Sequence, residues 1–436
     1  MNFKLTEIGE LPFEWEVDTM ENALSEIIDY RGKTPVKSET GIVTLSAKSV
    51  KDGYIDYSKA YFISEMTYQK FMVRGFPRKG DILLTTEAPL GLVAKLDREK
   101  VGIAQRLLTL RGKKEYLLND YLMYYLMSNE GKHQLTSRQS GTTVTGIKQK
   151  EFRKCLISIP PFEEQKAIAH ILSTLDDKIE VNNQINKTLE NMAQAIFKQW
   201  FVDFEFPNEE GEPYKSSGGE MFESELGMIP KGWEVKKSSD IANVNIGKTP
   251  PRKEKECFTL DPDDYKWISI KDLGNSGAYI FDSSEYLTKE SIEKYNVKVV
   301  PDNTVVLSFK LTIGRVSITC GQMTTNEAIA HFNLSNKSKI TTEYLYLYLK
   351  GFDYGKLGNT SSIANAVNSK IIKSMPIIVP DNKTIKTFSE VMESVFSKIK
   401  YTIKQSDKLI EIRDSLLPKL MSGEIRVPLD EEGIVS

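Results

Sequence analysis

The chain repeats itself at about half its length, and this repeat constrains the fold more than any other feature. Residues 11–17 (LPFEWEV) recur as 229–235 (IPKGWEV), and 32–35 (GKTP) recur as 247–250 (GKTP). Residues 80–84 (GDILL), followed by Gly91, correspond to 303–307 (NTVVL), followed by Gly314. Residues 157–160 (ISIP) correspond to 377–380 (IIVP). A period this long predicts two similar domains in one chain.

A long helical pattern with apolar residues at seven-residue spacing follows each copy. Such spacing predicts a coiled-coil seam, and isolated polar residues on a seam fix its register. The polar residues of the seam fall at equivalent positions in both helices: Asn182 and Asn186 in the first, Thr402 and Ser406 in the second. This match favours a helix pair over the alternative of two amphipathic helices lying on globular domains. Pro418 is expected to end or kink the second helix near Leu417. The predicted seam residues are Ile168, Leu172, Leu175, Ile179, Asn182, Asn186, Leu189, Ile196, Phe388, Met392, Val395, Ile399, Thr402, Ser406, Leu409 and Leu416.

These patterns predict an α+β fold with two similar mixed domains, each followed by a long helix, and the two helices paired as an antiparallel coiled coil with pseudo-two-fold symmetry. Short β runs are expected at 42–45, 82–85, 92–94, 107–110, 267–270, 304–308 and 316–319, and short helices at 120–128 and 342–350. The polar segment 208–219 (NEEGEPYKSSGG) indicates a flexible connection. The expected parts are 1–159, first domain; 160–200, first helix; 201–228, linker; 229–380, second domain; 381–425, second helix; and 426–436, tail.

The balanced net charge hides basic and acidic segments. The chain has 58 Lys and Arg against 60 Asp and Glu. Residues 31–115 hold 17 bases and 9 acids (17 − 9 = +8), residues 131–154 hold 6 and 1 (+5), and residues 201–225 hold 1 and 8 (−7). A basic surface indicates a polyanionic partner such as nucleic acid, although an ordinary solvated surface explains the charge alone equally well.

No motif supports catalysis by this chain. A phosphate-binding loop needs a glycine five residues before its Gly-Lys, and Ile27 and Ala242 occupy those positions. The three histidines are far apart, and no HExxH, GxSxG or GxGxxG motif occurs. The three cysteines have neither metal nor disulfide spacing, so free thiols are expected. With no apolar run of about 18 residues and no leader-like N-terminus, the chain is expected to be cytoplasmic, without a membrane partner.

Two similar domains that read one duplex with the same face must be related by a two-fold axis perpendicular to the DNA. Helices related by that axis run antiparallel. A helix of about 35 residues is about 50 Å long, which exceeds the ~34–36 Å of one DNA turn. The repeat therefore favours an antiparallel spacer that separates two readers of different half-sites.

Several segments in this order resemble the specificity subunit of Type I restriction-modification systems. They are 160–165 (PPFEEQ) with Ile168, Leu172 and Asp176; 200–204 (WFVDF); 224–234 (SELGMIPKGWE); and 416–425 (LLPKLMSGEI). The resemblance covers nearly the whole chain. The second copy departs from it at 380–384, where PDNKT replaces the Pro-Pro…Glu-Gln signature.

The resemblance implies a DNA sequence-specificity subunit with one target-recognition domain for each half of a bipartite, asymmetric site. It further implies that the helices act as a spacer and dock two methyltransferase subunits. Restriction subunits would complete an ATP-dependent endonuclease. The chain itself would bind no cofactor or metal, while S-adenosylmethionine, ATP and Mg would be bound by the partner subunits. Two alternatives are a non-catalytic coiled-coil scaffold that does not recognise DNA and a stand-alone methyltransferase.

Candidate DNA-binding residues are those whose side chains commonly contact phosphates or base edges. Arg pairs with guanine, Asn or Gln pairs with adenine, and lysine contacts phosphate. Loops on a repeated scaffold are the places where recognition is expected. In the first domain the candidates are Arg31, Lys33, Lys48, Arg106, Arg138, Gln139 and Thr142. In the second they are Lys248, Arg252, Lys271, Lys310, Arg315, Asn359 and Ser362. Trp15 and Trp233 are expected in the core.

Overall fold

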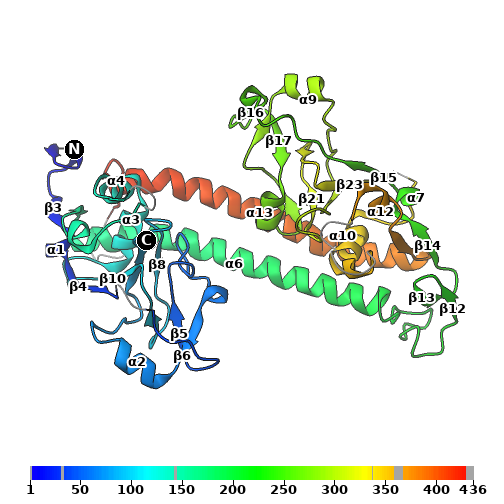
Figure 1. Ribbon diagram of the computed structural model, residues 1–436, viewed down its shortest axis with the longest axis horizontal. Coiled ribbons are helices and arrows are strands. Elements are labelled where there is room, and N and C mark those ends of the chain that lie inside the picture. Colours follow the sequence, from blue (N-terminus) through cyan, green and yellow to red (C-terminus); the bar gives the residue numbers. More distant parts are fainter. Residues whose placement is uncertain (1, 31–33, 142–144, 336, 358–366, 429–436) are drawn as a thin grey trace. The chain divides into compact units, whose positions relative to one another are not determined.

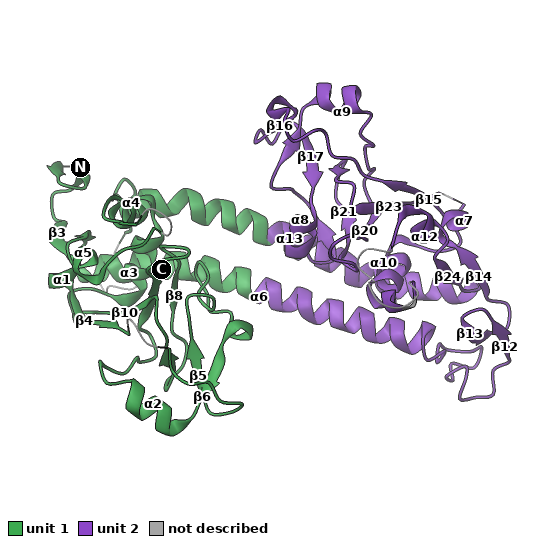
Figure 2. Cartoon of the chain, in the orientation of Figure 1, with its two compact units in different colours: residues 1–180, 406–436 green, residues 181–405 purple. Residues whose placement is uncertain are grey.

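A computed structural model of the chain describes residues 2–30, 34–141, 145–335, 337–357 and 367–428. It contains two compact units (Figure 2): residues 1–180 together with 406–436 form the first, and residues 181–405 form the second. The long helices α6 (Phe162–Phe201) and α13 (Asn382–Met421) each contribute one part to each unit. The first unit is therefore built from two separate stretches of sequence.

The first unit combines small sheets with short helices (Figure 1). Its helices, besides the parts of α6 and α13, are α1 (Met20–Ala23), α2 (Glu65–Phe71), α3 (Asn119–Met127), α4 (Asn129–Ser137), α5 (Gln149–Phe152) and the 3-10 turn η1 (Tyr57–Lys59). Its strands are β1 (Phe3–Thr6), β2 (Gly9–Pro12), β3 (Glu16–Thr19), β4 (Leu24–Asp29), β5 (Ile42–Leu45), β6 (Tyr61–Ile63), β7 (Ile82–Thr85), β8 (Val93–Lys95), β9 (Gly102–Ile103), β10 (Leu107–Gly112) and β11 (Leu156–Ile159).

The second unit repeats most of this order, with additional elements between β15 (Ala242–Ile246) and β19 (Tyr286–Leu287). Its helices are α7 (Ser238–Ile241), α8 (Ile270–Asn275), α9 (Lys289–Tyr295), α10 (Thr342–Gly351) and α12 (Ser369–Lys373), with 3-10 turns η2 (Lys255–Cys257) and η3 (Tyr354–Leu357). Its strands are β12 (Met221–Ser224), β13 (Gly227–Pro230), β14 (Glu234–Lys237), β15 (Ala242–Ile246), β16 (Phe258–Thr259), β17 (Tyr265–Ile268), β18 (Tyr279–Ile280), β19 (Tyr286–Leu287), β20 (Val305–Ser308), β21 (Val316–Thr319), β22 (Thr324–Thr325), β23 (Ile329–Leu334) and β24 (Pro376–Val379).

The same central sheet occurs in both units. Its order is β4-β10-β7-β8 in the first unit and β15-β23-β20-β21-β18 in the second. In each, the two middle strands are buried along nearly their whole length, because helices and small sheets cover both faces. The short parallel pairing of β5 with β9 is matched by β17 with β22. The expectation of two similar mixed domains, each followed by a long helix, is confirmed.

Side chains on α6 and α13 meet in antiparallel order within each unit. In the second unit Asn182 donates to Gln405 (3.0 Å), and Thr402 donates to Asn186. In the first unit Arg413 donates to Asp176 (2.8 Å). All sixteen predicted seam side chains are buried or half-buried. That the helices form one coiled coil with pseudo-two-fold symmetry concerns both units together and stays a prediction.

A buried tryptophan ties each domain to the start of its long helix. Trp15 is fully buried and Trp233 is 2% exposed, as expected for core anchors. The indole of Trp15 donates to Glu164 on α6 (3.0 Å), and that of Trp233 donates to Asp381 just before α13 (3.0 Å). Carboxylates at a helix N-terminus are favoured by the helix dipole. In the first unit Arg426 also contacts Glu164, through Nε (2.6 Å) and Nη2 (3.0 Å).

One local expectation is wrong in part. The sequence predicts that Pro418 ends or kinks the second helix near Leu417, but helix α13 does not end there: it runs through Pro418 to Met421, and the Ser422 amide donates to the Pro418 carbonyl (3.0 Å). Leu420 and Met421 are buried in the core of the first unit, and this burial offsets the hydrogen bond that proline removes. Within the segment 208–219, which is expected to be a flexible connection, the Tyr214 ring stacks on Phe206, which in turn stacks on Trp233. The flexibility of this segment stays a prediction.

We expect Arg426→Ala to lower the free energy of unfolding of the first unit by about 3 kcal/mol, because it leaves the buried Glu164 carboxylate without its cation. Urea denaturation measures the loss, and hydrogen exchange shows that the first unit opens. Lys419→Ala is the control, because its ion pair with Glu424 is exposed and 3.8 Å long, and we expect it to cost less than about 1 kcal/mol. Equal losses of stability in the two variants would contradict a stabilising role for the ion pair between Arg426 and Glu164.

We expect the second unit to lose stability in mild acid through His331. This residue is 3% exposed on β23, and burial lowers its pKa from 6.5 to about 4. The unfolded chain therefore takes up the proton first, so the contribution of neutral His331 is complete above pH 6.5. It is lost as the pH falls toward 4, by on the order of 3 kcal/mol.

The matched variant is His331→Thr, because Thr109 occupies the equivalent position of the first unit. The comparison is between the pH dependence of unfolding in the two proteins from pH 7.5 to 4.5. The wild type should show the steeper dependence, and identical slopes would refute the assignment to His331.

Candidate nucleic-acid interface

Each unit has a hairpin loop between two neighbouring strands of its central sheet, and the two loops share positive φ angles at two equivalent positions. Ala88, between β7 and β8, has φ 51°, and Leu311, between β20 and β21, has φ 61°. Gly91 and Gly314 follow three residues later with φ 91° and φ 90°. Holding a residue other than glycine in this region costs about 1 kcal/mol or more, so the surrounding structure must enforce it. The same frame thus presents different side chains in the two units.

In the first unit this hairpin lies beside the loop that the sequence nominated for recognition. Thr86 accepts the Ile147 amide (2.9 Å), and a β-bridge joins Glu87 to Gly146. The base of the loop is closed by paired backbone hydrogen bonds between Ser140 and Gly146 (2.8 and 3.0 Å). The predicted loop and the hairpin therefore form one surface.

Three predicted DNA-binding residues belong to this surface. Arg106, at φ 70°, places its Nε 2.6 Å from the Glu87 carboxylate. Arg138 follows α4, and its Nε is buried without a hydrogen-bond partner among the described residues. Gln139 is exposed. A buried guanidinium nitrogen without a partner is uncommon in proteins, and a ligand acceptor such as a base edge would satisfy it.

Lys48 and Lys271 occupy equivalent positions in the two units. Each follows a strand of the parallel pairing by three residues, β5 for Lys48 and β17 for Lys271, and each is exposed. Within the described ranges neither amine lies within 4 Å of a carboxylate. Such amines suit contacts with phosphate, which position a protein without reading sequence.

In the second unit two of the predicted arginines already have partners. Arg252 donates two hydrogen bonds to Glu285 (2.9 and 3.0 Å), and its guanidinium lies over the rings of Phe258 (4.2 Å) and Trp267 (4.6 Å). Arg315 donates to the Ile270 carbonyl and packs against Gly274, where a Cβ atom would lie 2.2 Å from its Nη1. Both side chains therefore stabilise the unit whatever else they contact.

Lysines remain exposed on the second unit. Lys310 is on the hairpin loop, next to Leu311, which is 82% exposed. Lys248 presents its side chain to solvent, while its backbone amide donates to Thr325 (2.9 Å) and its carbonyl accepts the Trp267 indole (3.3 Å). Ala88 and Leu311, at the positive-φ positions of the two loops, are not among the residues predicted from the sequence. The matched glycines three residues later were the available signal. Arg31, Lys33, Thr142, Asn359 and Ser362 lie outside the described residues.

In the described part of the chain we searched the side chains for a metal site and for reactive thiols. This part contains no group of three or more His, Cys, Asp or Glu side chains that could hold a metal ion. Cys155, Cys257 and Cys320 are buried free thiols, and burial raises the pKa of Cys155 to about 12. Of the helices in the described ranges, none combines the length and the apolar composition that a membrane crossing needs.

Comparison with known proteins gives one consistent family. The model of the "Type I restriction modification DNA specificity domain" matches residues 14–191 and again 230–412. The Type I restriction enzyme MjaIX specificity subunit of Methanocaldococcus jannaschii is 30% identical, over 98% of this chain and 96% of that protein. The HindI specificity subunit of Haemophilus influenzae is 27% identical, over 80% of this chain and 87% of that protein.

A solved structure shares the fold. The crystal structure of a Type I restriction-modification S subunit from M. genitalium matches with a TM-score of 0.55 and 15% identity. The match covers 96% of this chain and 97% of that one.

We expect Arg315→Ala to destabilise the second unit by about 1–3 kcal/mol, because the Ile270 carbonyl and the space beside Gly274 lose their partner. Lys310→Ala, five residues away on the same loop, should leave stability unchanged within about 0.5 kcal/mol. Urea denaturation of both variants makes the comparison. A stable Arg315→Ala protein would show that this side chain has no structural role.

Proposed function

Because the chain belongs to the family of Type I restriction-modification DNA specificity subunits, we propose that it recognises a bipartite, asymmetric DNA site, with one half read by each unit. The family is non-catalytic, and its place in a Type I system implies DNA, methyltransferase and restriction partners. The finer assignments of residues, stoichiometry and cofactors are our proposals.

One observation supports the proposal that the DNA site is bipartite. The two units share a four-strand order in the central sheet, and their hairpin loops share positive φ angles at two equivalent positions, yet the loop residues are Glu87, Ala88 and Pro89 in one and Lys310, Leu311 and Thr312 in the other. Base edges are discriminated by side chains placed on a fixed backbone. Two similar loops that present different side chains suit two half-sites of different sequence. A site composed of two different half-sites is asymmetric.

We assign residues 1–159 and 229–380 as the target-recognition domains, joined by the linker 201–228, and residues 160–200 and 381–425 as the helices that space them, with 426–436 as a tail. The antiparallel contacts between α6 and α13 within each unit support a spacer. The DNA contacts proposed are those of the fourteen nominated residues. Lys48 and Lys271 are assigned to phosphates, and Arg138 and Gln139 to bases.

The partners proposed are two methyltransferase subunits and the restriction subunits. S-adenosylmethionine, ATP and Mg would then be used by these partners. Assembly with DNA would take place in the cytoplasm. Nothing in the structure favours a scaffold that ignores DNA or a methyltransferase that acts alone.

The test compares Arg138→Ala with Lys48→Ala in the assembled methyltransferase. If Arg138 contacts a base, its loss should relax discrimination by about 1–3 kcal/mol at base pairs in one half-site only. Loss of Lys48 should weaken binding to all sequences and reduce the salt dependence by about one charge. Binding to a library of duplexes at several salt concentrations measures both. A change in both half-sites after Arg138→Ala would contradict one domain for each half.

A further inference from the structure

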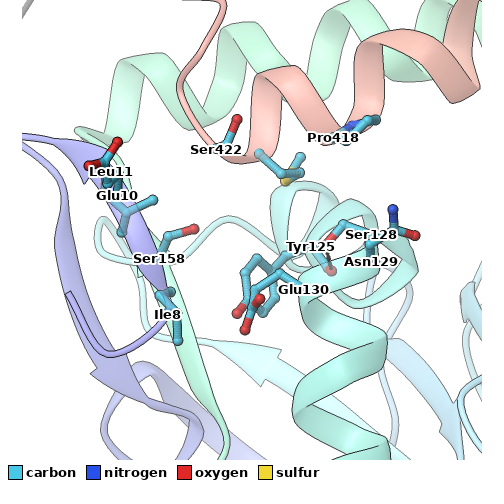
Figure 3. A pocket seen from close by; sticks show the side chains of 11 residues that line it. Ile8, Glu10, Leu11, Tyr125, Ser128, Asn129, Glu130, Ser158, Pro418 and Ser422 are labelled. Atoms are coloured by element: carbon cyan, nitrogen blue, oxygen red, sulfur yellow. Dashed lines mark hydrogen bonds between the residues drawn. The ribbon is translucent and has the colours of Figure 1, made fainter. Parts of the chain in front are cut away.

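A cavity in the first unit lies where three elements meet (Figure 3). The β1–β2 hairpin forms one side, α3 and the start of α4 form another, and the C-terminal end of α13 covers it, with Pro418 and Ser422 above Tyr125 and Glu130. Its volume is about 240 Å³. No DNA-binding residue nominated from the sequence lines it.

The second unit has a cavity built from the same three elements. The β12–β13 hairpin, α10 and the C-terminal end of α6 line a larger space of about 930 Å³. Every residue that lines the first cavity, except Leu11, has its repeat counterpart in the lining of the second. Ile8 corresponds to Leu226, and Met421 corresponds to Phe201. Duplication has therefore preserved a cavity as well as a fold.

The frame of the cavity is held by equivalent hydrogen bonds. Tyr125 donates from its hydroxyl to the Leu156 carbonyl (2.9 Å), and Tyr348 donates to the equivalent Pro376 carbonyl (3.0 Å). Both hairpins are closed by a side-chain hydroxyl bound to a glycine carbonyl, at 2.6 Å in β1–β2 and 2.7 Å in β12–β13. Equivalent hydrogen bonds therefore hold the elements that border both cavities, although the volumes of the cavities differ.

The charges at the two cavities also agree. Each is lined by one carboxylate from the hairpin and one from the segment just after the helix that follows the central sheet: Glu10 and Glu130, in the first turn of α4, in the first unit, and Glu225 and Asp353 in the second. Among the described residues no cationic nitrogen lies within 4 Å of these four carboxylates. Lys198 lines the second cavity, but its amine is 2.6 Å from Asp203. An occupant with positive charge would complement both sites, whereas a phosphate would be repelled.

The rim of the second cavity carries exposed apolar side chains, whereas the equivalent positions of the first cavity are Glu10 and Ser422. In the second unit Met228 is 52% exposed and Val202 is 57% exposed, and both line the cavity. An exposed apolar surface bordered by carboxylates is typical of a site for a protein partner rather than for a nucleic acid.

We propose that this cavity is a protein-docking site, present once in each unit, that receives an apolar side chain and a neighbouring lysine or arginine from a methyltransferase subunit. The identity of the partner rests on the proposed function. The repeated site accounts for two copies of one partner on a single chain, because each copy meets the same three elements.

The test introduces a lysine at one equivalent rim position of each cavity. Met228→Lys removes an apolar contact and opposes the positive charge of the occupant, and Glu10→Lys reverses a charge at the matching position of the first hairpin. Native mass spectrometry of the chain mixed with its methyltransferase subunit counts the bound copies. We expect two copies on the wild type, one on each single variant and none on the double variant, with affinity at the altered cavity about tenfold or more weaker.

Two controls separate docking from folding and from general charge effects. Leu260→Lys places the same charge at a position that is 80% exposed and outside the cavity, and it should keep two copies. Met228→Glu removes the same apolar contact but keeps a negative rim, so it should weaken binding less than Met228→Lys. Thermal melting should place all variants near the wild type.

Two copies on the double variant would overturn the docking site and leave the proposed function intact. No copies on the wild type would contradict the proposed function as well. Self-association of the wild type that Met228→Lys abolishes would assign the cavity to a second copy of this chain and overturn the proposal.

Discussion

An indole N–H inside a protein core requires an acceptor, and in each unit that acceptor is a carboxylate at the start of a long helix. The bond from Trp15 to Glu164 and the bond from Trp233 to Asp381 join the segment between the N-terminal hairpin and the first strand of each domain to its helix. Without this bond the buried carboxylate would lose one of its hydrogen-bond donors, and the domain would no longer be held in a fixed position on the helix. The hairpin loops and both cavities depend on it, because all are positioned by elements that pack around these tryptophans.

The units satisfy the same requirement with different residues. In the first, Arg426 neutralises Glu164 through two nitrogens. In the second, the residue at the position equivalent to Arg426 is Phe206, which stacks on Trp233 at 5.0 Å between ring centroids. Asp381 instead accepts hydrogen bonds from Thr384 and from the backbone amides of Lys383 and Thr384, which hold its pKa below the usual value. One helix start is thus closed by an ion pair and the other by stacked rings and a capped turn.

Much of the architecture could be predicted because it depends on patterns that the sequence displays twice. The repeat gave the two domains, seven-residue spacing gave the long helices, and alternating apolar runs gave the strands of the central sheets. Contacts between distant residues could not be predicted this way. Nothing near Arg315 or Arg252 in the sequence shows that Ile270 or Glu285 will be their partner. The extension of α13 through Pro418 depends likewise on burial of Leu420 and Met421 in a core formed by the other end of the chain.

That core has a consequence for biosynthesis. The first unit needs residues 406–436, whereas residues 1–180 leave the ribosome long before them. At about 5–20 residues per second, roughly 10 to 45 seconds separate the two stretches. The second unit is contiguous and all of its residues are made before residue 406, so the domain translated first is the last to be completed. During this wait the nascent chain exposes the apolar surface that Leu420 and Met421 will cover, and it is then most open to chaperones and proteases.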